Sequence, residues 1–190
     1  TYLGDGAVNQ GQVYESFNMA ALWDLPVLFV IENNQYGMGT AVTRAAAGRS
    51  LAERGAAYGI PGRQVDGMDV LAVRKAGAQA LEHCRTGKGP YILEMKTYRY
   101  RGHSMSDPAK YRTREEVDAM RKQHDPIDQL REVLHKQNVT EDRLKDIDAD
   151  VKAIVLRATE FAQTSPEPDP SELFTDILIP VGGRGAGMEG

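Results

Sequence analysis

The chain has 190 residues, of which 41% are hydrophobic and 26% charged, and its formal net charge is −4. Its length is enough for one domain with a sizeable core. The small negative charge, without a basic block, argues against a nucleic-acid-binding protein, and the longest apolar stretch is far too short to span a membrane. The single cysteine, Cys84, excludes an internal disulfide.

The first third of the chain predicts a strand, a helix and a second strand. Tyr2-Leu3 is typical of the end of a buried strand. Because the chain opens there without an initiator methionine, we expect a fragment of a longer protein. Residues 9–23 carry one apolar helical face, formed by Val13, Phe17, Ala20 and Ala21. Residues 27–31 form a continuous apolar run, typical of a strand covered on both faces, so the unit predicts a parallel sheet.

The rest of the chain predicts further strands and then helices. A short strand at Gln64-Val65 precedes a helix that Asp69 caps, and residues 91–97 form another strand. A polar loop, residues 98–112, follows. Helices are expected after Thr113, after Asp125 and after Thr140. We expect residues 1–164 to form an α/β domain with C-terminal helices, and residues 165–190 to form an extended connector and a glycine-rich tail.

Two short motifs follow the first two predicted strands. Asp5 lies where the first strand gives way to its helix, and Asn34 follows the second strand. In a parallel sheet both positions fall on the carboxyl edge, where ligands of such folds bind. A carboxylate, an amide oxygen and a loop carbonyl suit Mg²⁺, which often shares its site with phosphate oxygens. Gly4 and Gly6 let a phosphate approach the backbone closely, and a helix beginning near Ala7 would add its dipole.

The spacing of these motifs resembles a known signature. Gly4-Asp5-Gly6 followed by Asn33-Asn34, with one helix and one strand between them, is similar to the thiamine diphosphate motif. Residues 4–40, 63–74 and 97–117 resemble the α subunits of the pyruvate dehydrogenase first component, within the 2-oxo acid dehydrogenase α-subunit family. The similarity covers roughly residues 1 to 178. It implies a thiamine diphosphate-binding fold that lacks its N-terminal part here.

The resemblance also implies a role for individual residues. Asp5 and Asn34 would ligate Mg²⁺ through side-chain oxygens, and Tyr36 through its backbone carbonyl. Gly6 and Ala7 would contact the diphosphate. His103 would stand at the active-site entrance as the catalytic residue, near the cofactor and substrate, where an imidazole can donate a hydrogen bond or move a proton.

The implied activity is that of a larger assembly. The family decarboxylates pyruvate with thiamine diphosphate and Mg²⁺ and reductively acetylates the lipoyl domain of an acetyltransferase component. The cofactor lies between α and β subunits in an expected α2β2 enzyme, and the β chain supplies the activating glutamate. This piece alone should therefore be inactive. No membrane or nucleic-acid partner is implied, and the compartment would be the cytoplasm in a bacterium or the mitochondrial matrix in a eukaryote.

Two alternative functions stay open at this level. An acetoin or branched-chain 2-oxo acid dehydrogenase α subunit would share the same motifs. A non-catalytic α/β ligand-binding module is a different class, but the sequence contains neither G-x-x-x-x-G-K-[ST] nor G-x-G-x-x-G, the usual nucleotide-binding loops.

Overall fold

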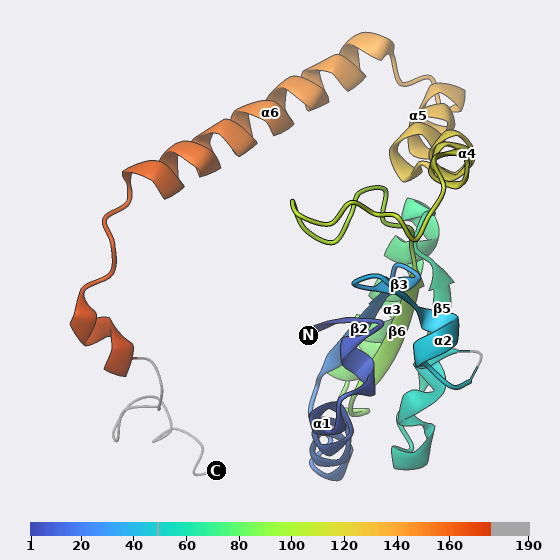
Figure 1. The fold of residues 1–190 in the computed structure, drawn as a ribbon, viewed down its shortest axis with the longest axis vertical. Helices are drawn as coiled ribbons and strands as arrows, with labels where there is room; N and C mark the ends of the chain where they lie inside the picture. Colours follow the sequence, from blue (N-terminus) through green and yellow to red (C-terminus); the bar gives the residue numbers. More distant parts are fainter. Residues whose placement is uncertain (49, 176–190) are drawn as a thin grey trace. The chain divides into compact units, whose positions relative to one another are not determined.

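The computed structural model describes residues 1–48 and 50–175 of the chain (Figure 1). These residues belong to two compact units, Thr1–Asn138 and Val139–Gly190. The division at residue 164 that the sequence predicts stays a prediction. The predicted glycine-rich tail, Val181–Gly190, lies outside the described residues.

A parallel sheet of four strands forms the centre of the first unit. The strands are β1 (Tyr2–Gly4), β2 (Leu28–Asn33), β5 (Gly62–Asp66) and β6 (Tyr91–Lys96). Their order is β1-β2-β6-β5, and every neighbouring pair is parallel. This confirms the predicted parallel sheet, and it brings the carboxyl ends of β1 and β2 side by side. Tyr2, predicted to be buried, is 76% exposed.

One face of the sheet is covered by α1 (Gly11–Leu22) and the 3₁₀ segment η2 (Leu51–Tyr58). Phe17 of α1 is fully buried, and its ring packs edge-on against Phe29 of β2, with 4.8 Å between ring centroids. Burial of such apolar surface is the main force that holds a helix to a sheet. The core on this face consists of Val8, Val13, Phe17, Ala20, Phe29, Ile31, Leu51, Ala52, Ile60 and Ile92.

The opposite face is covered by α3 (Val70–Arg85), which begins where the sequence predicts. The Asp69 carboxylate caps it by accepting hydrogen bonds from the backbone N–H groups of Leu71 and Ala72. The small residues Ala76 and Ala80 let this helix lie close to the sheet, where the core adds Val65, Leu93 and Met95. Helices on both faces explain why residues 27–31 are apolar without alternation.

Several short elements were not expected from the sequence. A single 3₁₀ turn, η1 (Ala7–Asn9), follows β1, and α1 begins only at Gly11. The prediction of a helix beginning near Ala7 is therefore wrong by four residues, and the dipole of α1 does not start beside Gly6. The other unexpected elements are β3 (Tyr36–Gly37), β4 (Thr40–Ala41), α2 (Val42–Ala45) and η2.

The predicted C-terminal helices are present. In the first unit, α4 (Arg114–His124) and α5 (Pro126–Lys136) lie at the carboxyl end of the sheet (Figure 1). Thr113 and Asp125 cap them through their side chains, as predicted. The second unit contains α6 (Glu141–Thr164) and the short η3 (Pro170–Phe174).

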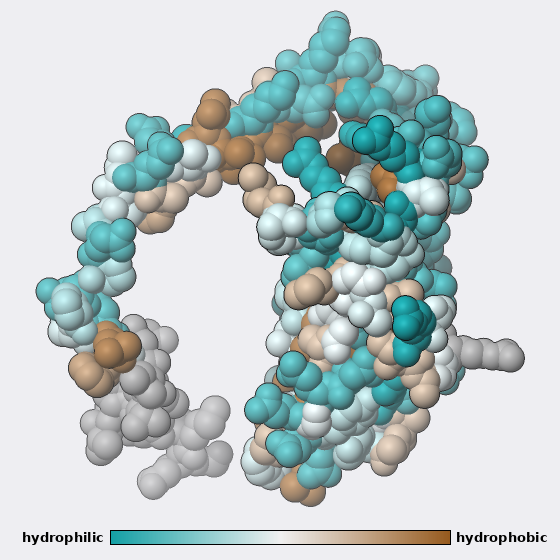
Figure 2. Space-filling view, in the orientation of Figure 1, coloured by the Kyte–Doolittle hydropathy of each residue, from teal (hydrophilic) through white to brown (hydrophobic). Residues whose placement is uncertain are grey.

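The helix α6 exposes an apolar stripe along its length, visible as brown residues in Figure 2. The stripe contains Ile147, Val151, Ile154 and Val155, which are 41–58% exposed. In the described part of the chain, no helix is both long enough and apolar enough to cross a membrane.

Candidate functional site

The two predicted metal ligands, Asp5 and Asn34, meet at the ends of adjacent strands. Asp5 follows β1 directly and is only 3% exposed. Burial raises the pKa of its carboxyl group, and hydrogen bonds from the backbone of Asp5 and Asn34 together with the Arg99 guanidinium counter only part of this. The backbone N–H of Asn34 thus lies within hydrogen-bonding reach of the Asp5 carboxylate.

The turn after β1 also contacts the strand β3, at Gly6 and Gly37. A Cβ atom added to Gly37 would lie 3.2 Å from the Cα of Gly6 and 3.7 Å from Oδ2 of Asp5. The backbone of β3 therefore lies directly against the turn after β1. This close approach favours glycine at position 37, where an added Cβ would press on the backbone of Gly6.

Replacing Gly37 with alanine should weaken Mg²⁺-dependent thiamine diphosphate binding by the full-length enzyme about tenfold, since the new methyl group pushes β3 away from Asp5. Isothermal titration of thiamine diphosphate at fixed Mg²⁺ would measure this. Gly11→Ala is the matched control, because a Cβ there has no neighbour within 4 Å. Equal affinity of both variants would show that the contact between Gly6 and Gly37 does not shape the site.

Hydrogen bonds fix the turn that carries Asn34 and Tyr36. Gln35 has a positive φ of 76°, which is uncommon for a residue with a side chain. Its backbone N–H donates to Oδ1 of Asn33 at 3.1 Å, and the Tyr36 N–H donates to Oδ1 of Asn34 at 3.3 Å. Two successive side-chain amides therefore hold the chain in this tight reversal.

His103, the predicted catalytic residue, is exposed and lies in the loop 98–113. Its Nδ1 is 3.3 Å from Nη1 of Arg99, whose guanidinium also attracts Asp5. Arg99 therefore connects His103 to Asp5. The same guanidinium donates to the Met38 carbonyl and to the Tyr111 hydroxyl.

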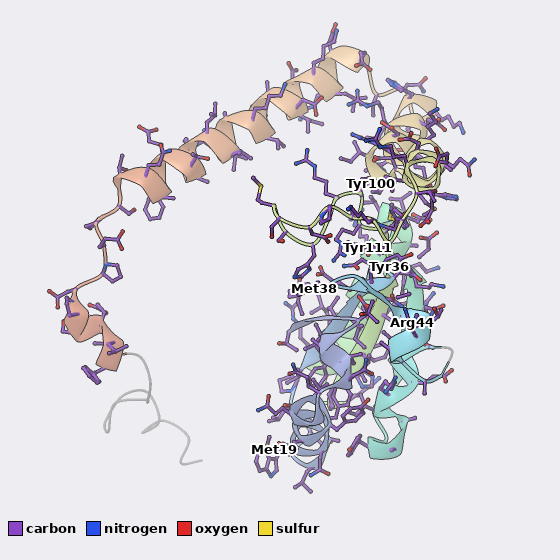
Figure 3. All side chains as sticks on the ribbon, in the orientation of Figure 1. Met19, Tyr36, Met38, Arg44, Tyr100 and Tyr111 are labelled. Atoms are coloured by element: carbon purple, nitrogen blue, oxygen red, sulfur yellow. The ribbon has the colours of Figure 1, made fainter. Side chains whose placement is uncertain are left out.

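Aromatic rings join the loop to the turn. The ring centroids of Tyr36 and Tyr111 lie 5.0 Å apart, and both residues are labelled in Figure 3. Arg112 is 9% exposed, and its guanidinium lies between 5.2 and 5.6 Å from the rings of Tyr36, Tyr98 and Tyr111. It also donates to the carbonyls of Arg99 and Arg101. The cation thus holds both ends of the loop against the aromatic cluster.

Asp107 organises the tip of the loop. Its carboxylate accepts from the backbone N–H of His103 at 2.7 Å, from Ala109 at 2.8 Å and from the Tyr111 hydroxyl at 2.7 Å. These hydrogen bonds, led by the one from His103, lower the pKa of Asp107 to about 2. The group is therefore ionised at neutral pH, and it fixes the backbone of His103.

Four of these residues were not predicted from the sequence: Arg99, Asp107, Tyr111 and Arg112. The density of Arg and Tyr in residues 98–112 is the signal that could have found them, because such side chains pair by stacking and charge. The buried Glu94 of β6 was not predicted either.

The residues present fit a magnesium ion. Among the described residues, no group of three His, Cys, Asp or Glu side chains could hold a metal. The pair Asp5 and Asn34 instead offers one carboxylate and one amide oxygen, a sparse donor set suited to an ion that keeps water or phosphate oxygens. Because burial disfavours the Asp5 carboxylate, a divalent cation would supply the missing positive charge.

Comparison with known proteins gives consistent matches. The chain is 64% identical over 179 residues to the pyruvate dehydrogenase E1 component subunit alpha of Rhizobium meliloti, covering 94% of this chain and 51% of that protein. It is 58% identical over 178 residues to the subunit of the same name from Zymomonas mobilis, covering 94% and 50%. A testis-specific mitochondrial form from Rattus norvegicus is 55% identical over 172 residues, covering 90% and 44%. The chain thus spans about half the length of the curated relatives it matches.

A family model agrees with these matches over most of the chain. The model described as "Dehydrogenase E1 component" matches residues 1–171. It includes β1, the turn at residues 33–37 and the loop 98–113, which carry the site described above. The chain belongs to the dehydrogenase E1 component family.

Proposed function

We propose that this chain is the magnesium-binding portion of the α subunit of a thiamine diphosphate-dependent pyruvate dehydrogenase. The whole enzyme would decarboxylate pyruvate and reductively acetylate a lipoyl partner. The names of the relatives and the family match support this proposal. The single observation that carries it is the buried Asp5 carboxylate, which lies within hydrogen-bonding reach of the Asn34 backbone N–H and beside Gly6 and Gly37.

Each site residue would have a defined task. Asp5 and Asn34 would hold Mg²⁺ through side-chain oxygens, and Tyr36 through its carbonyl. Gly6 and Ala7 would leave space for the diphosphate and contact it with backbone groups. When bound, thiamine diphosphate supplies the electron sink for decarboxylation of a 2-oxo acid.

His103 would act on the substrate side. Its backbone is held by Asp107, and its ring is held by Arg99. An imidazole so placed can donate a hydrogen bond to a substrate carboxylate or carry a proton, while Arg99 adds positive charge that favours an anionic substrate. Pyruvate is such an anion.

The partners follow from the same proposal. A β subunit would complete the cofactor site in an α2β2 enzyme, and the lipoyl domain of an acetyltransferase component would accept the acetyl group. Relatives occur in bacteria and in mitochondria. A bacterial cytoplasm is our proposal for the compartment, with the mitochondrial matrix as the eukaryotic equivalent.

Turnover of two 2-oxo acids by the complete enzyme tests the proposal. The full-length α subunit, purified with its β subunit, should decarboxylate pyruvate much faster than 3-methyl-2-oxobutanoate. A preference for the branched substrate would indicate a branched-chain enzyme instead. Residues 1–190 alone should show no turnover, and robust activity of this piece would overturn the two-subunit proposal.

A further inference from the structure

A buried charge in the central strand β6 has no part in the chemistry proposed so far. Glu94 is 1% exposed and lies on the sheet face that packs against α1 and η2. Its neighbours on that face include Ile31 and Ile92, which are both fully buried. An ionised group in such surroundings is costly unless hydrogen bonds compensate it, so its partners show what it does.

The two carboxylate oxygens of Glu94 have different partners. Oε2 accepts four hydrogen bonds, from Ser50 Oγ at 2.7 Å, Leu51 N at 2.8 Å, Gln64 Nε2 at 3.0 Å and Ala52 N at 3.1 Å. These bonds tie β6 to the start of η2 and to β5. Among the described residues, Oε1 has one partner, the side-chain amide of Asn33, whose Nδ2 donates at 2.7 Å. Only Oε1 therefore connects Glu94 to the turn at residues 33–37.

This single bond determines which way the Asn33 amide faces. Burial by itself raises the pKa of Glu94, but the hydrogen bonds from Asn33, Ser50, Gln64 and Ala52 outweigh it and hold the pKa below its usual value. An ionised carboxylate can only accept hydrogen bonds, so Asn33 must present its NH₂ group to it. Oδ1 of Asn33 is then left to accept from the backbone N–H of Gln35.

The orientation matters because Gln35 lies between the two residues proposed to hold the metal. Its left-handed backbone, with φ of 76°, is stabilised by the bond to Oδ1 of Asn33. Asn34 and Tyr36 flank it on either side, and Asn34 Oδ1 accepts from the Tyr36 N–H. A flipped Asn33 amide would set two donors against each other at Gln35 and open the turn.

We propose that Glu94 is a positioning residue for the metal site: through Oε1 it fixes the Asn33 amide, and thereby the turn that presents Asn34 and Tyr36 to Asp5. The proposal rests on the magnesium site proposed above and assigns a task to a residue outside it.

Reversing the polarity of this hydrogen bond tests the proposal. In Glu94→Gln, the four donors at the Oε2 position require the amide oxygen there, so the new NH₂ group faces the NH₂ of Asn33. In Asn33→Asp, two carboxylates face each other in a buried place. In the double variant N33D/E94Q, the aspartate accepts both from the new amide and from the Gln35 N–H, so the turn has its hydrogen bonds again.

The experiment uses the full-length α subunit assembled with its β subunit. The Mg²⁺ concentration that gives half-maximal thiamine diphosphate binding is measured by calorimetry, and the unfolding midpoint of the cofactor-free enzyme is measured beside it. In each single variant, the Mg²⁺ concentration for half-maximal binding should rise at least about tenfold. This is the effect expected when a residue that supports a metal ligand is changed. The double variant should recover most of that loss. Gln64→Ala is the matched control, because it removes a bond to the other oxygen of the same carboxylate and should leave Mg²⁺ affinity unchanged.

Other results would overturn the proposal. An unchanged Mg²⁺ affinity in E94Q, a double variant no better than the single ones, or an equal loss in Q64A would each reduce Glu94 to a structural role. If E94Q does not assemble with the β subunit, Asn33→Ala is the second test, because it removes the hydrogen bond to Oε1 of Glu94 and leaves the bonds at Oε2 in place. Unchanged Mg²⁺ affinity in N33A would also overturn the proposal. If the wild-type enzyme bound thiamine diphosphate without any dependence on Mg²⁺, the proposed metal site would be wrong, and the positioning role of Glu94 would be wrong with it.

Discussion

Replacing Asp5 with asparagine should reduce Mg²⁺-dependent thiamine diphosphate binding by the complete enzyme more than about 100-fold, beyond the loss typical of changes behind a metal ligand. Asp5 is the only carboxylate in the proposed donor set, and the amide that replaces it carries no charge to balance the cation. Calorimetric titration of thiamine diphosphate at increasing Mg²⁺ concentrations would measure the loss. Pyruvate decarboxylation should be lost in parallel.

The cofactor-free D5N enzyme should nevertheless be as stable as the wild type or slightly more so. Burial raises the pKa of Asp5, which means that the fold disfavours its charged form, and asparagine relieves that cost. Glu32→Gln is a suitable control, since Glu32 is an exposed carboxylate at the end of the neighbouring strand β2. If D5N bound thiamine diphosphate normally at low Mg²⁺, Asp5 would not be a metal ligand.

Truncating Phe17 to alanine should destabilise the full-length subunit by about 3–5 kcal/mol. Phe17 is fully buried between α1 and the sheet, and its ring makes edge-on contacts with Tyr14, Phe29 and Tyr58. Deleting the ring leaves a cavity that this packing cannot readily fill. The shift of the urea unfolding midpoint, followed by circular dichroism, gives the change in the free energy of unfolding.

Leu22→Ala on the same helix is the matched control. Leu22 is 70% exposed, so its truncation should change the free energy of unfolding by about 0.5 kcal/mol or less. Similar effects of both substitutions would mean that Phe17 is not the centre of this core.

The sequence predicted the regular part of the fold because apolar patterns and caps are local signals. The continuous apolar run at residues 27–31 and the capping residues Asp69, Thr113 and Asp125 each led to an element that the structure contains. The 3₁₀ segment η2 was not predicted because it is only eight residues long and two of its three buried residues, Ala52 and Gly55, are too small to mark an apolar face. The helix start near Ala7 was wrong because the turn after β1 intervenes.

The site could be predicted only where it follows strand ends. Asp5 and Asn34 follow adjacent strands of a parallel sheet, so the fold class alone places them together. Arg99 and Asp107 could not be found in this way, because their partners depend on the path of an irregular loop. Glu94 had a visible signal, a charge within the apolar run of β6, but its meaning depends on Asn33 and η2, which only the three-dimensional structure brings to it.

The pairing of β1 with β2 has a consequence for how the protein would be assembled. Gly4 lies opposite Glu32 in this register, and a slip along the strands would separate Asp5 from Asn34. A metal ion held by both residues would therefore bind only the correctly paired sheet and favour folding by mass action. At a concentration of a hundred times its dissociation constant, such a ligand adds about 2.7 kcal/mol to stability. Magnesium and thiamine diphosphate supplied during synthesis would thus act as folding aids for the pairing of these two strands.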